Sequence, residues 1–246
     1  MDLKEIERIW GKGRKGNQTP TFHIHNQYTR SLYDLDLIKN AIKNWISLPF
    51  PWQEIIYRDA LAVVPTGELA HSQVYLSVAR RNGKTEMQLS LMAVFATLFG
   101  ADVLYSAPDA DLAKKVYDRF VKAACDPKNL LSAYFPGLEA KNKVLEHVIQ
   151  AYDPTTGAEL GTISFRTRGG KGGRGGQYDV VIFDEAQDLT TEQYQRYGPT
   201  NAARKKYDKG KKKNPVSMTV FFGTPPPLDT KTEALVNGML CRRVRE

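Results

Sequence analysis

The sequence predicts an α/β fold in which a mostly parallel sheet is flanked by helices. One apolar stretch, residues 74–78, leads through a short loop into an apolar helical segment, 86–99. A second apolar run, residues 178–183, ends in two acids, Asp184 and Glu185. Four successive apolar residues suit a parallel strand that is buried on both faces. The strand–loop–helix unit and the buried strand therefore indicate an open α/β sheet.

The loop after the first strand carries a phosphate-binding signature. It reads Val78-Ala79-Arg80-Arg81-Asn82-Gly83-Lys84-Thr85 and ends in Gly-Lys-Thr, although the usual pattern begins with glycine where this chain has Val78. In such a loop Lys84 reaches the β and γ phosphates, and the Thr85 hydroxyl ligates Mg²⁺. The expected nucleotide contacts are Arg80, Arg81, Asn82, Gly83, Lys84 and Thr85.

The acidic pair supplies the second half of the expected site. Ligands of open α/β sheets bind beyond the carboxyl ends of the strands, which is where Asp184 and Glu185 emerge. We expect Asp184 to hold Mg²⁺ through its water shell, and Glu185 to orient and deprotonate the attacking water. The two motifs together predict a P-loop NTPase of the RecA-like class with a catalytic glutamate, using ATP and Mg²⁺.

Two helical patterns precede the first strand, over 35–46 and 51–63, and the second opens with proline at a favourable first-turn position. Within it, Trp52 and Gln53 lie about thirty residues before Lys84. An aromatic ring and an amide are groups that recognise adenine, so both are candidate nucleotide contacts.

The middle of the chain continues the alternation, with a strand over 102–107 and a helix over 109–125. Extended segments 144–152 and 159–166 flank the turn sequence Asp-Pro-Thr-Thr-Gly, which predicts a β-hairpin. The glycine-rich stretch 166–176 follows and excludes a regular element. We therefore expect a hairpin and a glycine-rich loop inserted before the acidic strand.

The final predicted strand, 218–222, runs into Gly223-Thr224-Pro225. A hydroxyl at the tip of a strand beside the acidic one is placed to contact the γ-phosphate or the attacking water, which makes Thr224 a candidate. The pattern over 232–245 predicts a helix that follows. The predicted division is an N-terminal arm over 1–34, an ATPase core over 35–228 and a C-terminal helix over 229–246.

Composition and net charge indicate the size of the core and the kind of partner that the chain would bind. The 246 residues, 41% hydrophobic, suffice for one α/β core. The net charge of +8 and the pI near 9.3 point to an acidic partner, with nucleic acid as the first candidate. Candidate DNA contacts are the basic residues Lys171, Lys205, Lys206, Lys209, Lys211, Lys212 and Lys213.

Cysteine usage and hydropathy exclude other classes. Cys125 and Cys241 form no CxxC pair, which argues against a zinc site or a disulfide scaffold and favours a reducing compartment. The charged N-terminus is unlike a signal peptide, and the longest apolar stretch, 89–100, is too short to span a bilayer. The sequence predicts an intracellular protein without a membrane partner.

These motifs in this order resemble the ATPase domain of the large terminase subunit, the DNA-packaging motor of tailed bacteriophages. The resemblance runs from about Trp52 to Pro227. Terminases lack the first glycine of the phosphate loop and carry an arginine three residues before its Gly-Lys, matched by Val78 and Arg80. Their acidic strand ends in Asp-Glu, matched by Asp184 and Glu185.

Two further motifs match. The family's coupling motif is a Thr or Ser at the tip of the next core strand, here Thr224. An Arg-Gly about ten residues before the acidic pair supplies an arginine to the neighbouring subunit, and Arg174-Gly175 matches it (184 − 174 = 10). The resemblance thus implies that Arg174 acts in trans as an arginine finger, and that Arg80 and Thr224 act as phosphate sensors.

The resemblance also implies partners. It predicts a homo-oligomeric ring around double-stranded DNA, bound without sequence preference, that works with a portal protein and a small terminase subunit. The site of action would be the host cytoplasm, transiently on the procapsid. The family usually carries a carboxylate-rich nuclease domain after the ATPase, and these 246 residues are too few to hold one, so we expect no DNA cleavage by this chain.

Two alternatives stay open. A superfamily 1 or 2 helicase is one, because Asp184 to Asp188 reads DEAQD and Gln53 resembles the adenine-reading glutamine of those enzymes. The chain lacks a GD-x-x-Q segment after the box and a second motor domain, which argues against it. The other is a nucleotide-gated DNA-binding module without turnover, against which Glu185 argues. A phosphate-release assay would decide whether the chain is such a module without turnover.

Overall fold

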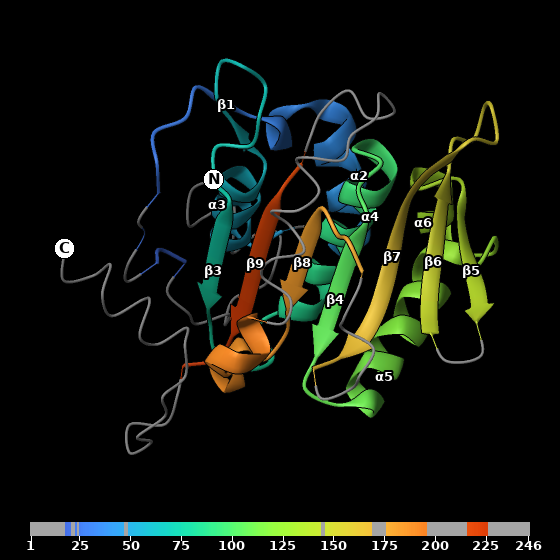
Figure 1. The fold of residues 1–246 in the computed structure, drawn as a ribbon. Helices are drawn as coiled ribbons and strands as arrows, with labels where there is room; N and C mark the ends of the chain where they lie inside the picture. Colours follow the sequence, from blue (N-terminus) through green and yellow to red (C-terminus); the bar gives the residue numbers. More distant parts are fainter. Residues whose placement is uncertain are drawn as a thin grey trace, which may run out of the picture.

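The computed structural model describes residues 18–20, 23, 25–46, 49–143, 146–168, 176–195 and 216–225. Seven strands form one mixed sheet in the order β3-β9-β8-β4-β7-β6-β5 (Figure 1). A separate two-stranded sheet pairs β1 with β2. The strands are β1 Arg30–Ser31, β2 Ala62–Val63, β3 Gln73–Ser77, β4 Val103–Ala107, β5 Leu138–Lys143, β6 Glu146–Tyr152, β7 Glu159–Thr167, β8 Val180–Phe183 and β9 Met218–Gly223.

The strands from β3 to β7 along this order run parallel, and β6 and β5 are antiparallel additions at one edge. The carboxyl ends of β3, β9, β8 and β4 therefore meet at one edge of the sheet, the lower edge in Figure 1. The strand β9 lies between β3 and β8. It thus brings Thr224 between the phosphate loop and the acidic pair, as the sequence predicted for a strand neighbouring β8.

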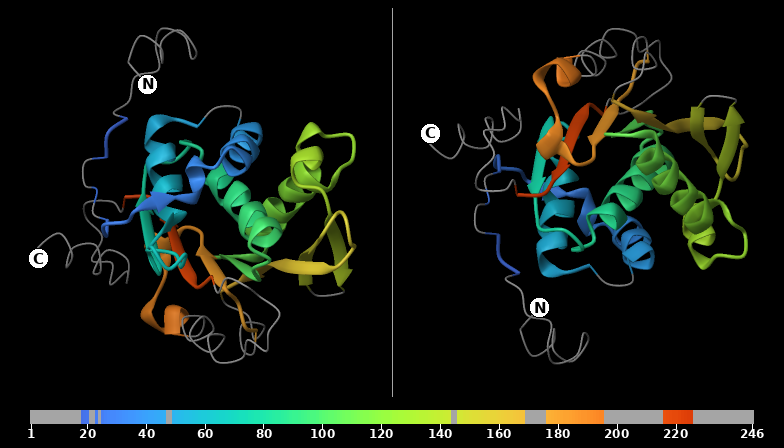
Figure 2. Two further views of the ribbon diagram at one scale, coloured as in Figure 1. Left: turned by 90° about the horizontal axis from the view of Figure 1, so that it is seen from above. Right: turned by 90° about the horizontal axis from the view of Figure 1, so that it is seen from below.

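The main helices cover one face of the sheet (Figures 1 and 2). The middle turns of the α4 helix, from Leu89 to Ala96, are buried on all sides between the sheet and the outer helices. The helices are α2 Asp36–Ile46, α3 Pro51–Ala60, α4 Lys84–Leu98, α5 Ala110–Phe120 and α6 Leu130–Tyr134. No described helix is long and apolar enough to cross a bilayer.

The strand β8 is buried on both faces of the sheet, as its apolar run predicted. Val180 and Ile182 point into the main core beneath the helices, whereas Val181 and Phe183 join a second cluster on the opposite face. In Figure 2 the segment that follows β8, drawn in orange, lies on this second face. Phe183 stacks there on Phe221 of β9, with ring centroids 5.4 Å apart.

Two element predictions need correction, and one strand was not predicted. The second helix was expected to reach residue 63, but α3 ends at Ala60, because Ala62 and Val63 pair with β1 instead. The helix expected over 109–125 is α-helical only from Ala110 to Phe120 and closes with a π-helical turn, Val121–Cys125. The predicted hairpin is present as β6 and β7, but its third strand, β5, was not foreseen.

The domain division stays a prediction. Tyr33, on the arm side of the boundary expected after residue 34, is fully buried and stacks on Tyr57 of α3 at 5.5 Å. The helix expected over 232–245 lies outside the described residues.

Candidate active site

The phosphate loop follows β3 and ends at Gly83, the N-cap of α4. Arg81 and Gly83 both have left-handed backbone, with φ of 65° and 82°. Left-handed residues alternating with ordinary ones turn successive N–H groups toward one side, which forms an anion-binding concavity. The Asn82 amide fastens this turn by donating to the carbonyl oxygens of Ala79 (3.1 Å) and Arg80 (3.3 Å).

Gly83 is required by both conformation and space. A Cβ on this residue would lie 2.8 Å from Nε2 of Gln53. Gln53 is itself buried, and its Oε1 accepts a hydrogen bond from the Phe50 N–H at 2.8 Å, which caps α3. Helix α3 therefore packs directly against the phosphate loop through this glutamine.

Lys84 opens helix α4 and is largely buried. Its Nζ donates to the carbonyl oxygens of Val78 (2.9 Å) and Ala79 (3.4 Å). Burial lowers the pKa of this lysine, and the charges of Glu185 and Asp184 oppose that effect. The loop thus holds a cation in a partly dehydrated position facing the two acids, where it suits a phosphate ligand.

Asp184 lies at the carboxyl end of β8 and is 5% exposed. Its Oδ1 accepts from the Gln88 amide (2.7 Å) and the Glu185 N–H (2.9 Å), and its Oδ2 accepts from the Tyr105 hydroxyl (2.7 Å). Burial, with the Asp184 charge, raises the pKa of Tyr105, so this hydroxyl stays a donor. Three donors match an ionised carboxylate whose position is fixed.

Glu185 follows in a left-handed conformation, with φ of 44° and ψ of 52°. This region is rare for residues other than glycine and is a mark of strained functional positions. Among the contacts that hold it, the Gln187 amide donates to its Oε2 at 2.7 Å, and Arg168 Nη1 donates to its backbone carbonyl at 3.2 Å. The turn directs the Glu185 side chain to the pocket beside the phosphate loop.

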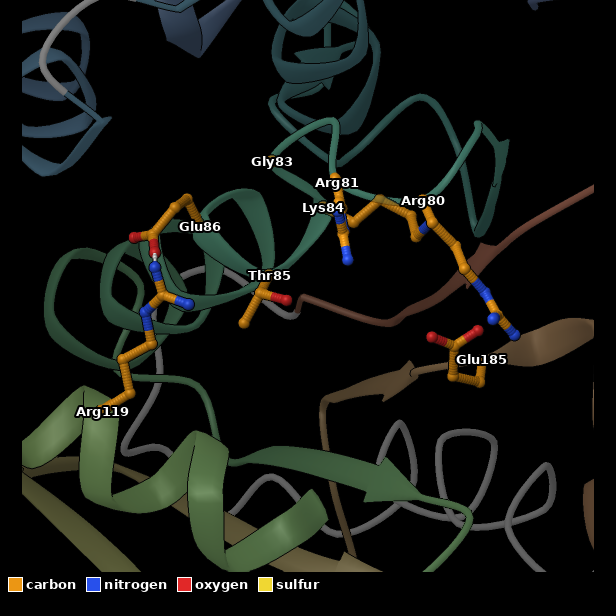
Figure 3. Close-up of a pocket in the computed structure, with 8 residues that line it drawn as sticks. All are labelled: Arg80, Arg81, Gly83, Lys84, Thr85, Glu86, Arg119 and Glu185. Atoms are coloured by element: carbon orange, nitrogen blue, oxygen red, sulfur yellow. Dashed lines mark ion pairs between the residues drawn. The ribbon is translucent and has the colours of Figure 1, made fainter.

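A pocket of about 320 Å³ lies between the loop and the acidic strand (Figure 3). Figure 3 shows Glu185 on one side, the ion pair between Glu86 and Arg119 on the other, and Thr85 between them. Glu86 also accepts from the Trp45 indole N–H at 3.2 Å. The lining residues are Arg80, Arg81, Gly83, Lys84, Thr85, Glu86, Arg119 and Glu185.

Thr224 follows β9 and is 9% exposed. Its backbone N–H donates to the Gln187 Oε1 at 3.0 Å, which joins the strand tip to the segment after β8. Gly223 makes this approach possible, since a Cβ there would lie 3.2 Å from the same oxygen. The structure thus brings Thr224 to the acidic edge, one hydrogen-bonded side chain away from Glu185.

The two candidate adenine contacts do not line this pocket. Trp52 packs against the main core and Gln53 caps α3, and neither lines the pocket, so their adenine-binding role stays a prediction. Arg174 and the candidate DNA contacts lie outside the described residues. These contacts are Lys171, Lys205, Lys206, Lys209, Lys211, Lys212 and Lys213.

The donor set is compatible with Mg²⁺. This ion takes oxygen ligands, keeps several waters and is usually bound through one or two carboxylates together with substrate phosphates. The Asp184 oxygens already accept three hydrogen bonds, which suits contact through metal-bound water. Among the described residues no group of three or more His, Cys, Asp or Glu could hold a metal alone. Thr85 and Asp184 would therefore hold Mg²⁺ together with a phosphate.

Sequence reasoning missed the residues that support the site. Gln88 lies one helical turn after Lys84, and this i,i+4 spacing is a signal that could have placed it on the same face. Arg168 is buried, and its Nε and Nη2 find no hydrogen-bond partner among the described residues. Burial lowers the pKa of Arg168, and the nearby Asp184, Asp188 and Glu185 charges oppose this. The placement of Arg168 depends on the pairing of β4 with β7, which no local sequence pattern predicts.

The phosphate loop after β3, the acids after β8 and the parallel sheet between them are the fold of a P-loop NTPase. Comparison with solved structures narrows the class. The ATPase domain of the Thermus phage P74-26 large terminase matches with a TM-score of 0.53 and 18% identity, over 76% of this chain and 69% of that one.

The large terminase of bacteriophage HK97 matches with a TM-score of 0.60 and 14% identity, over 85% of this chain and 41% of that one. This chain therefore spans less than half of the HK97 protein. No family model and no curated protein matches the sequence. The fold is that of the ATPase domain of phage large terminases, as the motifs predicted.

Proposed function

We propose that this chain is the ATP-hydrolysing domain of a viral DNA-packaging motor of the large-terminase type. The observation that carries the proposal is the pocket in which Lys84 and Glu185 face each other across the carboxyl edge of the sheet. A cation on a helix N-terminus suits the phosphates of ATP, and a carboxylate opposite suits the water that attacks them. The terminase-like fold supports the choice of this motor among ATPases.

In the proposed reaction the loop N–H groups and Lys84 hold the β and γ phosphates. Mg²⁺, when bound at Thr85 and Asp184, neutralises phosphate charge. Glu185 orients a water molecule toward the γ-phosphate and accepts its proton. Arg80 on the pocket wall and Thr224 at the tip of β9 sense the terminal phosphate. Arg174 of an adjacent copy stabilises transition-state charge.

The proposed substrate of the motor is double-stranded DNA, held through its phosphates and without sequence preference. The net charge of +8 supports this partner. The proposed assembly is a homo-oligomeric ring that works with a portal protein and a small terminase subunit in the host cytoplasm.

Two substitutions test the reaction. Lys84→Ala removes the group that holds phosphate, so ATP affinity should fall. Glu185→Ala removes the base, so affinity should stay within about twofold while turnover falls by a factor on the order of 10² to 10⁴. Fluorescent-nucleotide binding and phosphate release measure the two quantities.

Equal losses of nucleotide affinity in both variants would show that Glu185 has been misassigned. Absence of phosphate release from the unmodified chain, with and without duplex DNA, would favour the non-hydrolysing module. Strand separation of a DNA duplex would favour the helicase.

A further inference from the structure

The Gln187 side chain joins two parts of the site that the motifs treat separately. Its Nε2 donates to Glu185 Oε2 at 2.7 Å and to Asp188 Oδ2 at 3.2 Å, and its Oε1 accepts from the Thr224 N–H at 3.0 Å. One planar amide therefore contacts the carboxylate of the candidate base and the backbone of the candidate phosphate sensor.

The Glu185 carboxylate depends on this contact for its direction. Among the described residues Gln187 is the sole hydrogen-bond donor to that carboxylate. The donated bond occupies Oε2 and leaves Oε1 available on the side chain that lines the pocket. The Glu185 backbone is fixed separately by the left-handed turn and the Arg168 contact. The backbone contacts thus fix the position of the Glu185 Cα atom, and the Gln187 amide fixes the orientation of the Glu185 carboxylate.

The other end of the amide is equally constrained. The Gln187 backbone and Oε1 lie so close to Gly223 that a Cβ on this glycine would fall 3.4 Å and 3.2 Å from them. Gly223 also accepts a hydrogen bond from the Val78 N–H at 3.1 Å, at the start of the phosphate loop. A displacement at the tip of β9 therefore reaches both the loop and the amide that orients Glu185.

From these contacts we infer that Gln187 is a positioning residue, whose amide aims the Glu185 carboxylate at the pocket and couples that aim to the tip of β9. The inference rests on the proposed hydrolytic function. Hydrolysis needs the base within hydrogen-bond reach of the attacking water, and an error of about 1 Å in such a group costs up to about 10²-fold in rate.

Two near-isosteric substitutions separate positioning from plain structural support. Gln187→Leu removes both the donor to Glu185 and the acceptor for Thr224. Gln187→Glu keeps an acceptor for the Thr224 N–H but replaces the donor with an oxygen that repels the Glu185 carboxylate. Gln193→Leu is the matched control, because this glutamine lies in the same segment and its bond partner is Thr190 rather than Glu185.

We expect kcat for ATP hydrolysis to fall by about 10- to 100-fold in both Gln187 variants, while the ATP dissociation constant changes by less than about threefold. The melting temperature of Gln187→Glu should stay near that of the unmodified chain, and Gln193→Leu should retain full kcat. Phosphate release at saturating ATP, nucleotide titration and thermal unfolding provide these values.

A Gln187→Glu variant with unchanged kcat would overturn the inference, because anchoring of β9 would then be the only role of the amide. A rise in kcat in either variant would also overturn it, since the amide would then restrain the base rather than aim it. Failure of the proposed function is a separate result, recognised by an unmodified chain that binds ATP without releasing phosphate.

Discussion

At the residue scale the site depends on backbone conformations that few side chains tolerate. Arg81, Gly83 and Glu185 all have positive φ, and all three line the pocket. Such residues cost on the order of 1–3 kcal/mol each when they are not glycine. The fold therefore spends stability to turn the loop N–H groups and the Glu185 carboxylate toward one space.

Gly83→Ala tests this requirement, and Gly67→Ala is its control. Both glycines have φ near +85°, but a Cβ at Gly67 would meet no atom within 4 Å, whereas at Gly83 it would meet Gln53 Nε2 at 2.8 Å. The control should lose about 1 kcal/mol of unfolding free energy through backbone strain alone. Gly83→Ala should lose more, together with nucleotide affinity.

Urea unfolding and nucleotide titration measure the two effects. Adding Gln53→Ala to Gly83→Ala should recover part of the lost affinity, because it removes the atom that the new methyl group meets. Equal destabilisation by the two glycine substitutions, with unchanged affinity in both, would contradict the close packing of α3 against the loop.

At the element scale, prediction from sequence succeeded where one local signal fixes the answer. The Gly83-Lys84-Thr85 sequence predicts a strand, a loop and a helix around it, and the apolar run before Asp184 predicts a buried strand. Prediction failed where a distant partner decides. The sequence around Val63 predicted the end of a helix, but Val63 pairs with β1 in the folded chain. Among the described strands, β5 joins the sheet through its pairing with β6.

The supporting residues of the site escaped prediction for the same reason. Gln187 and Arg168 act through contacts with β9 and with the turn after β8, which exist only after the strands have paired. Arg119 reaches the pocket from the last turn of α5, more than thirty residues after Lys84 in the chain (119 − 84 = 35). Local patterns locate the residues of a loop or a strand end far better than the distant residues that hold them in place.

The burial of Cys125 in the π-helical turn after α5 leads to a prediction about the reactivity of its thiol. Burial, with a smaller effect of the Glu139 charge, raises the pKa of Cys125 from 9.0 to about 12. The native thiol should therefore react with iodoacetamide at pH 8 slower, by a factor on the order of 10², than the thiol of the urea-unfolded chain. A Cys241→Ser background isolates this signal, followed by mass spectrometry.

The sign of the pH effect follows from the raised pKa. The folded chain keeps the Cys125 proton longer than the unfolded chain, so the contribution to stability is complete below about pH 9 and is lost as pH rises toward 12. Equal alkylation rates in native and unfolded protein at pH 8 would show that the turn does not protect this thiol.

At the scale of the whole molecule, substitution of Arg174 tests whether ATP hydrolysis requires a second copy of the chain. An arginine supplied by a neighbouring copy contributes on the order of 10³ to 10⁵ in rate. Arg174→Ala should therefore bind ATP and fail to hydrolyse it. Mixed with Glu185→Ala protein it should regain part of the activity, because an intact Arg174 can then face an intact Glu185.

Phosphate release from the mixture, at protein concentrations that support assembly, is the measurement. Each variant alone supplies the baseline. A mixture no more active than its components would assign Arg174 a role within its own subunit or none in catalysis.

The position of β9 between β3 and β8 determines when, during synthesis of the chain, the two halves of the candidate site can come together. Among the described strands β3 pairs only with β9, and the pairing joins Gln73 to Thr219, 146 residues later (219 − 73 = 146). Contacts between such distant residues form slowly and late. On the ribosome the phosphate loop is therefore synthesised well before β9, the strand that pairs β3 with the rest of the described sheet. A chain truncated before β9 would keep the contact between Gln88 and Asp184 but would lack the strand that seats β3 beside β8, so we expect the phosphate loop to be fixed against Glu185 only after β9 has been made.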